Sequence, residues 1–413
     1  MSRFLVDSLT DKRALLNCKV FGALSDVVAP VKKYLDANAA KQITVFADCV
    51  FALTGGGVFR TQNTVLTEAN LDSGTFTIGS DYYVYLCDPG SDADEIYIIS
   101  KNSTYPSGYN ADTSRKIGGF HFGKCRKSLS VSDVYDGIVP ASVWTLLWRP
   151  ACSPEAMVYI GGGTWLDIYI NSDDANGGLL SKYNATPITG TEGLNWYIAQ
   201  ERLRRVGKRM PSYGEWCKGA EGSPQGLDAS NANGWTATSN TARQLTGYVA
   251  NATSLLGLRD CAGNVWEWLD ELCLEPTASS WNWYDVVPGY GQIYMPSNTA
   301  LHALLAGGSW HHGARCGART VDCSFYPWNV RTNVGVRGAC DFYYYAGQIG
   351  TVKALPTDFS RSQRIRPVRG NTRQTSKRTA AASSPCKRGS RVALWGTNAS
   401  ITFTIKFTPM KIC

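Results

Sequence analysis

Histidine, thiol and carboxylate groups, which carry most metal and acid–base chemistry in proteins, gather in two parts of this sequence. The adjacent pair His311 and His312 precedes Cys316 by four residues. Four carboxylates occur upstream, at Asp260, Glu267, Asp270 and Glu271. Imidazole and thiolate bind transition metals, and carboxylates bind Ca²⁺ or transfer protons. These residue types therefore raise the question of a catalytic or metal centre.

The spacing of these residues does not favour such a centre. Neighbouring residues of a strand face opposite sides of a sheet, so His311 and His312 would diverge, and the only other histidines are His121 and His302. The P-loop motif GxxxxGK[ST] and the motifs GxSxG and HExxH are absent. We therefore predict no catalytic residues, no metal ligands and no cofactor. The alternative is a Ca²⁺ ion held by oxygen atoms of the 260–270 loop.

A segment between two glycine-containing motifs has the residue types of a recognition surface. Gly307-Gly308-Ser309-Trp310 opens it and Asn333-Val334-Gly335-Val336-Arg337 closes it. Seven residues between them are suited to contact: His311, His312, Arg315, Asp322, Ser324, Phe325 and Arg331. Arginines supply charge-assisted hydrogen bonds, Phe325 supplies apolar area, and the histidine pair would titrate near pH 6–7. We predict that these seven side chains gather on one accessible face.

The elements expected to position this segment are mostly short. From about residue 58 to 125, β-branched and aromatic runs predict strands. Residues 157–160 and 165–170, joined by glycines, predict a hairpin. Residues 194–206 predict a helix, and Ser212 with Glu215 forms a capping box for a second. Residues 221–258 and 275–305 are expected to be mostly loop.

The charge of the chain is unevenly distributed. The formal net charge is +8, but twelve Lys or Arg and no Asp or Glu follow residue 360. The rest of the chain therefore has 29 basic and 33 acidic residues. The composition predicts a solvated, poorly ordered basic tail, with nucleic-acid binding by that tail as the alternative.

Cysteine usage and the N-terminal residues bear on where the chain acts. Thirteen cysteines without a CxxC motif disfavour a disulfide framework or a zinc finger. Charged residues from Asp7 to Arg13 interrupt any apolar run, so we expect no signal peptide. The sequence contains no stretch of 18 apolar residues, so we expect no membrane helix. Production in a bacterial host cytoplasm is the expectation.

The second half of the chain resembles the C-type-lectin fold of the formylglycine-generating enzymes. Five segments carry the resemblance: the hairpin at 155–162, Gly207-Lys208-Arg209-Met210-Pro211-Ser212-Tyr213-Gly214-Glu215-Trp216, Leu258-Arg259-Asp260-Cys261-Ala262-Gly263-Asn264-Val265-Trp266-Glu267-Trp268, and the two motifs that frame residues 307–337. The resemblance implies an α+β fold. Those enzymes place a copper-binding cysteine two residues after the GGSW tryptophan, where this chain has His312, and Cys316 matches a structural position. The resemblance therefore implies the fold and not the activity.

Seven residues are expected to form the scaffold of the recognition surface: Trp310, Trp328, Asn264, Trp266, Glu267, Trp268 and Arg337. Trp266 and Trp268 would lie on one face of an extended segment, with Glu267 between them. Arg337 is the expected partner of Glu267 in a buried ion pair.

The framed segment resembles the variable regions of proteins diversified by retroelements. In that family an error-prone reverse transcriptase randomises template adenines, commonly in Asn codons, which become NNC or NNT. Such codons encode His, Arg, Asp, Ser and Phe but never Trp. The resemblance predicts a pyrimidine in the third position of codons 311, 312, 315, 322, 324, 325 and 331. Residues 81–85 and 103–121 are similar to segments of phage tail-fibre and tail-tip proteins.

These observations predict four parts. They are an attachment or oligomerisation segment at 1–57, a small β-rich, phage-tail-like domain at 58–150, a C-type-lectin-like ligand-binding domain at 151–345 with variable region 307–337, and a basic extension at 346–413.

The predicted function is non-catalytic receptor binding in host-cell adhesion by a phage tail protein of the virion. Host receptors and other tail proteins are the expected partners. A homotrimer is expected, without membrane insertion or nucleic-acid binding. The alternatives are a metal- and oxygen-dependent formylglycine-generating-type enzyme and an adhesin on the bacterial cell surface.

Overall fold

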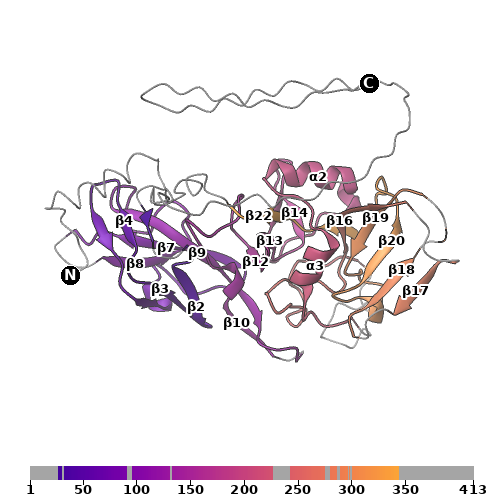
Figure 1. Ribbon diagram of the computed structural model, residues 1–413, viewed down its shortest axis with the longest axis horizontal. Coiled ribbons are helices and arrows are strands. Elements are labelled where there is room, and N and C mark those ends of the chain that lie inside the picture. Colours follow the sequence, from indigo (N-terminus) through magenta and orange to yellow (C-terminus); the bar gives the residue numbers. More distant parts are fainter. Residues whose placement is uncertain are drawn as a thin grey trace, which may run out of the picture. The chain divides into compact units, whose positions relative to one another are not determined.

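The computed structural model describes residues 27–29, 32–90, 95–130, 133–226, 242–274, 280–285, 289–295, 297 and 300–343. The chain divides into two compact units, Met1–Val352 and Lys353–Cys413. All described residues belong to the first unit, which Figure 1 shows in colour. The predicted basic extension at 346–413 and residues 1–26 of the predicted attachment segment lie outside the described residues.

The N-terminal region is built from three sheets. One contains β1 (Val27–Val28), β4 (Val50–Ala52) and β5 (Val58–Arg60), and a second contains β2 (Leu35–Ala39), β3 (Gln42–Val45) and β6 (Thr64–Leu66). The third has the order β10-β9-β7-β8, with β11 (Trp144–Thr145) paired to β9. Its long strands are β7 (Ser80–Cys87), β8 (Ile96–Ser100), β9 (Ser114–Arg126) and β10 (Val134–Ile138).

One apolar core joins these sheets. Tyr34, Leu35 and Phe51 pack in the same buried cluster as Val84 and Phe120. Residues on both sides of position 57 therefore share a core, and the predicted boundary between 57 and 58 does not coincide with a boundary in the packing. The β-branched and aromatic runs that predicted strands form β7, β8 and β9, as expected from their preference for pleated surfaces.

The lectin-type region contains three further sheets. The first has the order β12-β13-β22, formed by Met157–Gly161, Thr164–Asp167 and Ala339–Asp341, and β14 (Asn171–Asp173) pairs with β15 (Leu179–Ser181). The largest has the order β17-β18-β20-β19-β16-β21. Its strands are Asn282–Asp285, Gln292–Met295, Val321–Phe325, His302–Ala306, Trp266–Cys273 and Val334–Val336 in that order. The predicted hairpin at 157–170 is confirmed as β12 and β13.

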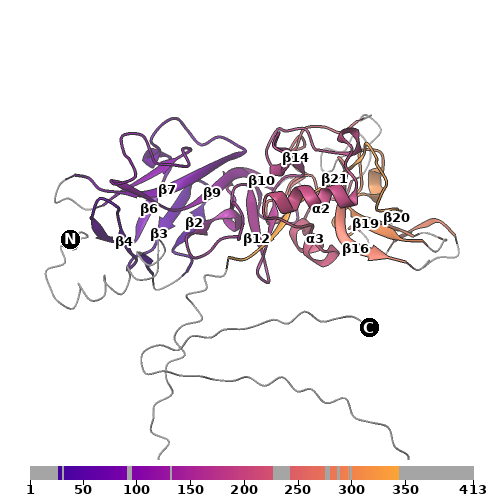
Figure 2. The same cartoon turned by 90° about the horizontal axis from the view of Figure 1, so that it is seen from above.

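Two α-helices accompany these sheets, α2 (Trp196–Arg205) and α3 (Tyr213–Ala220). Helix α3 lies against β12, β13, β16 and β19, and α2 lies against β15 (Figure 2). The predicted capping box is present, because Ser212 Oγ accepts from Glu215 N and Glu215 Oε2 accepts from Ser212 N. This box satisfies backbone N–H groups that the first helical turn leaves free.

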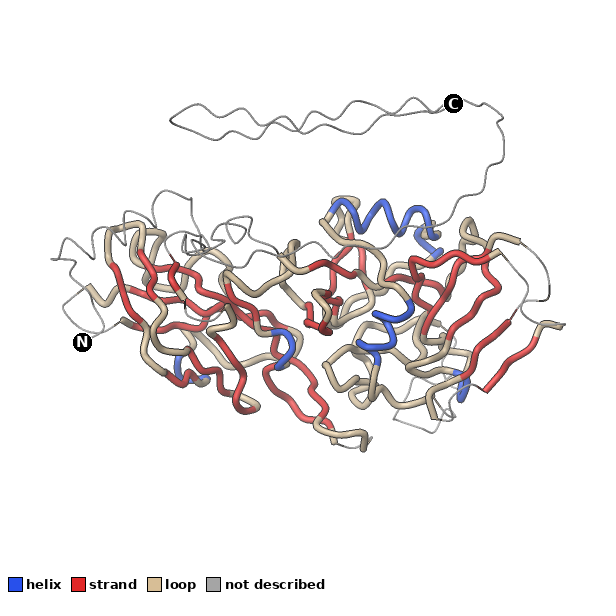
Figure 3. Tube along the Cα trace, in the orientation of Figure 1, coloured by secondary structure: helices blue, strands red, loops and turns tan. Residues whose placement is uncertain are grey.

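The balance of elements differs from the predicted α+β class. The described residues are mostly β, with only α2 and α3 as α-helices (Figure 3). The expected loop at 275–305 is also wrong, since β17, β18 and the start of β19 lie there. Short strands with mixed polar and aromatic residues leave a weak period-two signal, which the sequence prediction missed. No helix in the described ranges is long and apolar enough to cross a membrane.

Candidate functional site

Strand pairing brings the two framing motifs of the predicted surface to one sheet. Strand β16 pairs in parallel with β21, with Glu267 opposite Gly335, and in antiparallel with β19, with Glu267 opposite Ala306. The Gly307-Gly308 turn leaves β19 with both φ angles near +90°, a conformation that favours glycine. The chain between the two frames therefore starts and ends at the neighbours of β16.

The Glu267–Arg337 ion pair is confirmed, and every N–H donor of the Arg337 guanidinium is hydrogen-bonded. Arg337 Nε and Nη2 donate to the two Glu267 oxygens at 2.8 Å each. Its other N–H groups donate to the carbonyl oxygens of Asp167, Ile168 and Arg259 at 2.6–3.0 Å. Both residues are 0% exposed. Trp216 Nε1 also donates to Glu267 Oε2 at 3.0 Å, so the carboxylate joins β16 to α3.

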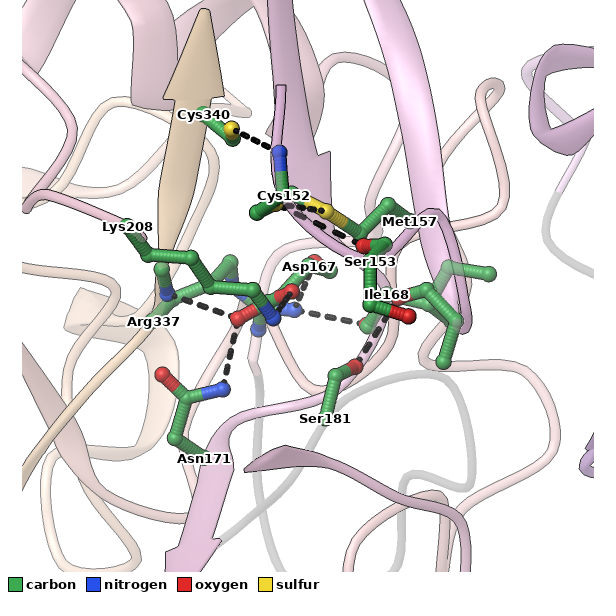
Figure 4. A network of polar contacts seen from close by, with 12 residues as sticks. Cys152, Ser153, Met157, Asp167, Ile168, Asn171, Ser181, Lys208, Arg337 and Cys340 are labelled. Atoms are coloured by element: carbon green, nitrogen blue, oxygen red, sulfur yellow. Dashed lines mark hydrogen bonds and ion pairs between the residues drawn. The ribbon is translucent and has the colours of Figure 1, made fainter. Parts of the chain in front are cut away.

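A second buried ion pair, between Lys208 and Asp167, lies next to Arg337 (Figure 4). Lys208 Nζ donates to Asp167 Oδ1 at 2.6 Å, and Asn171 Nδ2 donates to Asp167 Oδ2 at 2.6 Å. Burial lowers the pKa of Lys208, but the Asp167 carboxylate together with the nearby Cys152 and Cys340 raises it, and the pKa lies above its ordinary value. Because Arg337 also binds the Asp167 carbonyl, the two ion pairs form one network.

Trp266 and Trp268 lie on one side of β16, as predicted, and the ring of each contacts one residue of the predicted surface. Both indoles are 0% exposed. The His312 ring lies 5.0 Å from Trp266, and the Phe325 ring lies 6.4 Å from Trp268, both edge-on. Residues two apart on a strand share a face, so His312 and Phe325 lie on the same side of the sheet.

The two histidines lie in a turn and not on a strand, so they do not diverge. Their rings are 4.4 Å apart, and Ser309 Oγ is 2.9 Å from His312 Nδ1. His311 is exposed, whereas His312 is half-buried. Burial, followed by the nearby His311 and Arg315, lowers the pKa of His312 to about 3. Burial also lowers the pKa of His311. The expected titration of this pair near pH 6–7 is therefore wrong.

Asp322 is not on the accessible face. It is 4% exposed, and its Oδ1 accepts from Ser324 N and Ser324 Oγ at 2.8 and 2.6 Å. Burial raises the pKa of Asp322 to about 6, although the Ser324 bonds lower it. Asp322 therefore holds the half-buried Ser324 in place, and the prediction that its side chain faces outward is wrong.

The remaining predicted residues divide between surface and support differently from expectation. Arg315 and Arg331 are exposed, as predicted. Trp310 is half-buried, and its backbone N–H donates to the backbone carbonyl of Asn264 at 3.0 Å, which suits a scaffold role. Trp328 was expected in the scaffold but is 55% exposed. Its ring stacks on Tyr326 at 5.1 Å, so it forms part of the surface.

Sequence reasoning missed the aromatic hairpin formed by β17 and β18. Trp283 of β17 lies 5.7 Å from the His312 ring, and the Arg315 guanidinium lies 4.8 Å above the Trp283 ring. Tyr294 of β18 packs on Trp283 at 4.9 Å. The signal was present in the aromatic residues at 281, 283 and 284, but the segment was interpreted as loop. These aromatic residues line one side of the turn that contains His311, His312 and Arg315.

The candidate carboxylates and Cys316 do not converge. Glu267 binds Arg337, Asp260 Oδ2 accepts from Gly247 N, Asp270 accepts from Gln200, and Glu271 accepts from Tyr213 N. Cys316 is fully buried, and burial raises the pKa of its thiol to about 12. The described residues contain no group of three or more His, Cys, Asp or Glu placed to hold a metal ion.

Two family models match consecutive parts of the described chain. Residues 33–145 match the family described as Mtd second domain, and residues 148–342 match the Sulfatase-modifying factor enzyme 1-like domain. The Tail fiber receptor-binding protein of Bordetella phage BPP-1 is 27% identical over 321 residues, which are 72% of this chain and 79% of that protein.

Solved structures extend the similarity to the fold. The Major Tropism Determinant M1 Variant is 26% identical with a TM-score of 0.62, covering 77% of this chain and 86% of that one. The I1 Variant is 25% identical with a TM-score of 0.61, covering 76% and 85%. The predicted resemblance to tail proteins with a C-type-lectin-like domain is therefore confirmed.

Proposed function

We propose that this chain, a relative of the tail fiber receptor-binding protein and of the tropism determinants, is a non-catalytic receptor-binding protein of a phage tail. One observation carries the proposal. Exposed or half-buried side chains of different types stand on a fully buried polar and aromatic support, in a domain similar to that of the relatives. Such a site suits binding, because its contact side chains reach the surface while the buried ion pairs beneath them hold the strands in place.

The ligand-contacting residues in this proposal are His311, His312, Arg315, Ser324, Phe325 and Arg331, joined by Trp328 and the hairpin tryptophan Trp283. Asp322 supports Ser324 from below. Arginine and tryptophan contribute most per residue at protein interfaces, because they offer large contact areas and directed hydrogen bonds. A host-cell surface receptor is the proposed ligand.

Diversification by a retroelement would explain why variable contact residues lie beside constant tryptophans. NNC and NNT codons can encode the residues at contact positions 311, 312, 315, 324, 325 and 331, but they never encode tryptophan. Trp266, Trp268, Trp283 and Trp328 would then remain constant while their polar neighbours change. Exposed substitutions cost less than about 0.5 kcal/mol in most cases, so binding can change while the fold persists.

Assembly and location follow from the same proposal. A phage tail places several copies of a receptor-binding protein close together, and avidity turns weak single contacts into adhesion. We therefore infer a homotrimer in the virion, in contact with other tail proteins, produced in the bacterial host.

A library with NNT codons at positions 311, 312, 315, 324, 325 and 331 tests the proposal. We expect members that stay folded and bind different bacterial strains in a cell panel, whereas a matched library at exposed positions of α2 keeps the parental strain preference. Identical strain preference in both libraries would contradict the proposal. Sequencing of the flanking DNA checks diversification, by the presence of a reverse-transcriptase gene and an imperfect copy of codons 307–340.

A further inference from the structure

A cleft away from the variable segment contains two cationic side chains. It has a volume of about 580 Å³ and is lined by residues of β7, β9 and β11 and by the segment at 149–155 that leads to β12. Tyr83, Lys116, Trp144, Arg149 and Glu155 are among its lining residues. A cleft of this size fits a small molecule, and its charged groups should determine which one.

Lys116 is held in the cleft by an aromatic ring. Its ammonium lies 4.4 Å from the centre of the Tyr83 ring, and the side chain is half-buried in β9. Burial lowers the pKa of Lys116, Glu155 raises it and Arg149 lowers it further. The charges of Lys116 and Arg149 therefore act on each other across the cleft.

Arg149 has donor capacity that its neighbours leave unused. Its guanidinium stacks 4.7 Å from the Tyr343 ring, and its Nε is buried without a hydrogen-bond partner among the described residues. A buried donor without an acceptor costs free energy, about 1–3 kcal/mol in typical cases. The Nη groups of Arg149 also form no hydrogen bond or ion pair within the described residues, so an oxygen ligand in the cleft can accept from this guanidinium.

The nearby carboxylate does not neutralise the two cations. Glu155 accepts a short hydrogen bond from the Tyr83 hydroxyl, and no ion pair joins it to Lys116 or Arg149 within the described ranges. Two positive charges thus face one carboxylate that is already engaged. The cleft carries an excess of positive charge in a partly desolvated place, which favours an anion.

We propose that this cleft binds a small oxyanion between Lys116 and Arg149, with the Tyr83 and Trp144 rings against any organic part of the ligand. The chemistry fits a carboxylate, phosphate or sulfate, either free or at the end of a cell-surface glycan. The site lies outside residues 307–337, so the test of oxyanion binding is independent of the test of receptor binding.

Ligand-induced stabilisation of the full-length protein tests this site. Sodium phosphate, sulfate, acetate and glucuronate are titrated against chloride at constant ionic strength, and the unfolding temperature and tryptophan fluorescence are followed. At least one oxyanion should raise the unfolding temperature saturably, because a ligand that binds only the native state stabilises it. Glucuronate binding tighter than acetate would assign the site to acidic glycans, and tighter phosphate or sulfate would assign it to free tetrahedral ions.

Two variants and one control separate the site from a general salt effect. Lys116→Gln and Arg149→Gln should each weaken oxyanion binding at least tenfold, and Lys116→Gln remains informative if loss of Arg149 impairs folding. Arg204→Gln removes one exposed charge from α2 and should bind like the parent protein. Equal stabilisation of the parent and both cleft variants, or none of the parent by any oxyanion, would overturn the proposal.

Discussion

Arg337 and Glu267 form a two-bond ion pair with no exposed surface, and this pair joins the motif that closes the proposed binding segment to β16. The carboxylate lies on β16 between two tryptophans that face the binding side, while Arg337 directly follows β21. The ion pair is therefore on the opposite side of β16 from His312 and Phe325. Contact residues can change without altering the charges that hold the strands together.

Removal of one partner of this pair should be among the most damaging single changes in the chain. For Glu267→Gln we expect a loss of about 3–5 kcal/mol in the free energy of unfolding, because Arg337 keeps a buried, uncompensated charge. Urea denaturation measures the loss. Glu201→Gln, which breaks an exposed ion pair with Arg205 on α2, is the control and should cost less than about 1 kcal/mol. Similar losses in both variants would refute the scaffold role of Glu267.

Substitution at the exposed contact positions should separate binding from stability. Arg315→Ser and Arg331→Ser are expected to change the free energy of unfolding by less than about 0.5 kcal/mol, since both side chains are exposed. Adhesion of the labelled protein to its host cells should fall in at least one of them. The idea fails if both variants unfold like the parent and also adhere with unchanged affinity.

The low pKa of His312 predicts acid sensitivity. The unfolded chain takes up a proton on His312 near pH 6.5, whereas the folded chain resists it until about pH 3. The contribution of His312 to stability is therefore complete above pH 6.5 and declines as the pH falls through this window. Between pH 7 and pH 5, His312→Asn should lose about 1–2 kcal/mol less stability than the parent in urea denaturation. An unchanged pH dependence would contradict the buried, neutral state of this ring.

Asp322 should show the opposite slope. Its pKa is raised to about 6 by burial, while the unfolded carboxyl ionises near its ordinary value of 3.8. Between these values the unfolded state loses its proton first, so Asp322 lowers stability as the pH rises from about 4 to 6, and the penalty stays constant above that. Relative to the parent, Asp322→Asn should therefore gain about 1–3 kcal/mol between pH 3.5 and pH 7. A relative stability that does not vary with pH would show that Asp322 is ionised at low pH in the folded protein.

The sequence predicted the support of the site better than its surface. Glu267, Trp266 and Arg337 were identifiable because the motif around them is specific, and strand alternation dictates which of them share a face. Asp322 was assigned to the wrong side because residue type alone does not reveal a bulge, and Trp328 because it lies beyond the end of β20 at Phe325, where strand alternation no longer applies. The register of β19 and β20 shifts between Ala303 and Leu305, and such shifts change which side chains point outward.

The β17–β18 hairpin was missed for a different reason. Its partner in the sheet, β20, lies some thirty residues further along the chain, and the pairing of β18 with β20 is parallel and short. Non-local contacts of this kind leave no local period in the sequence. Only the run of aromatic residues indicated that the segment had a packing or binding role.

The hairpin gives the last prediction, in which Trp283 positions the contact residues. Its ring lies beside both His312 and Arg315, whereas Trp281 packs on Tyr294 and makes no aromatic contact with the predicted variable residues in the described part of the chain. Trp283→Ala should lower the affinity for host cells by about tenfold or more, as expected when a central aromatic residue is lost from an interface. Trp281→Ala, a tryptophan of the same segment, is the matched control and should have a smaller effect. Partial recovery in Trp283→Phe would indicate that the ring acts by supporting Arg315. If the two alanine variants bind equally well, the hairpin is not part of the binding site and the contacts end at the framed segment.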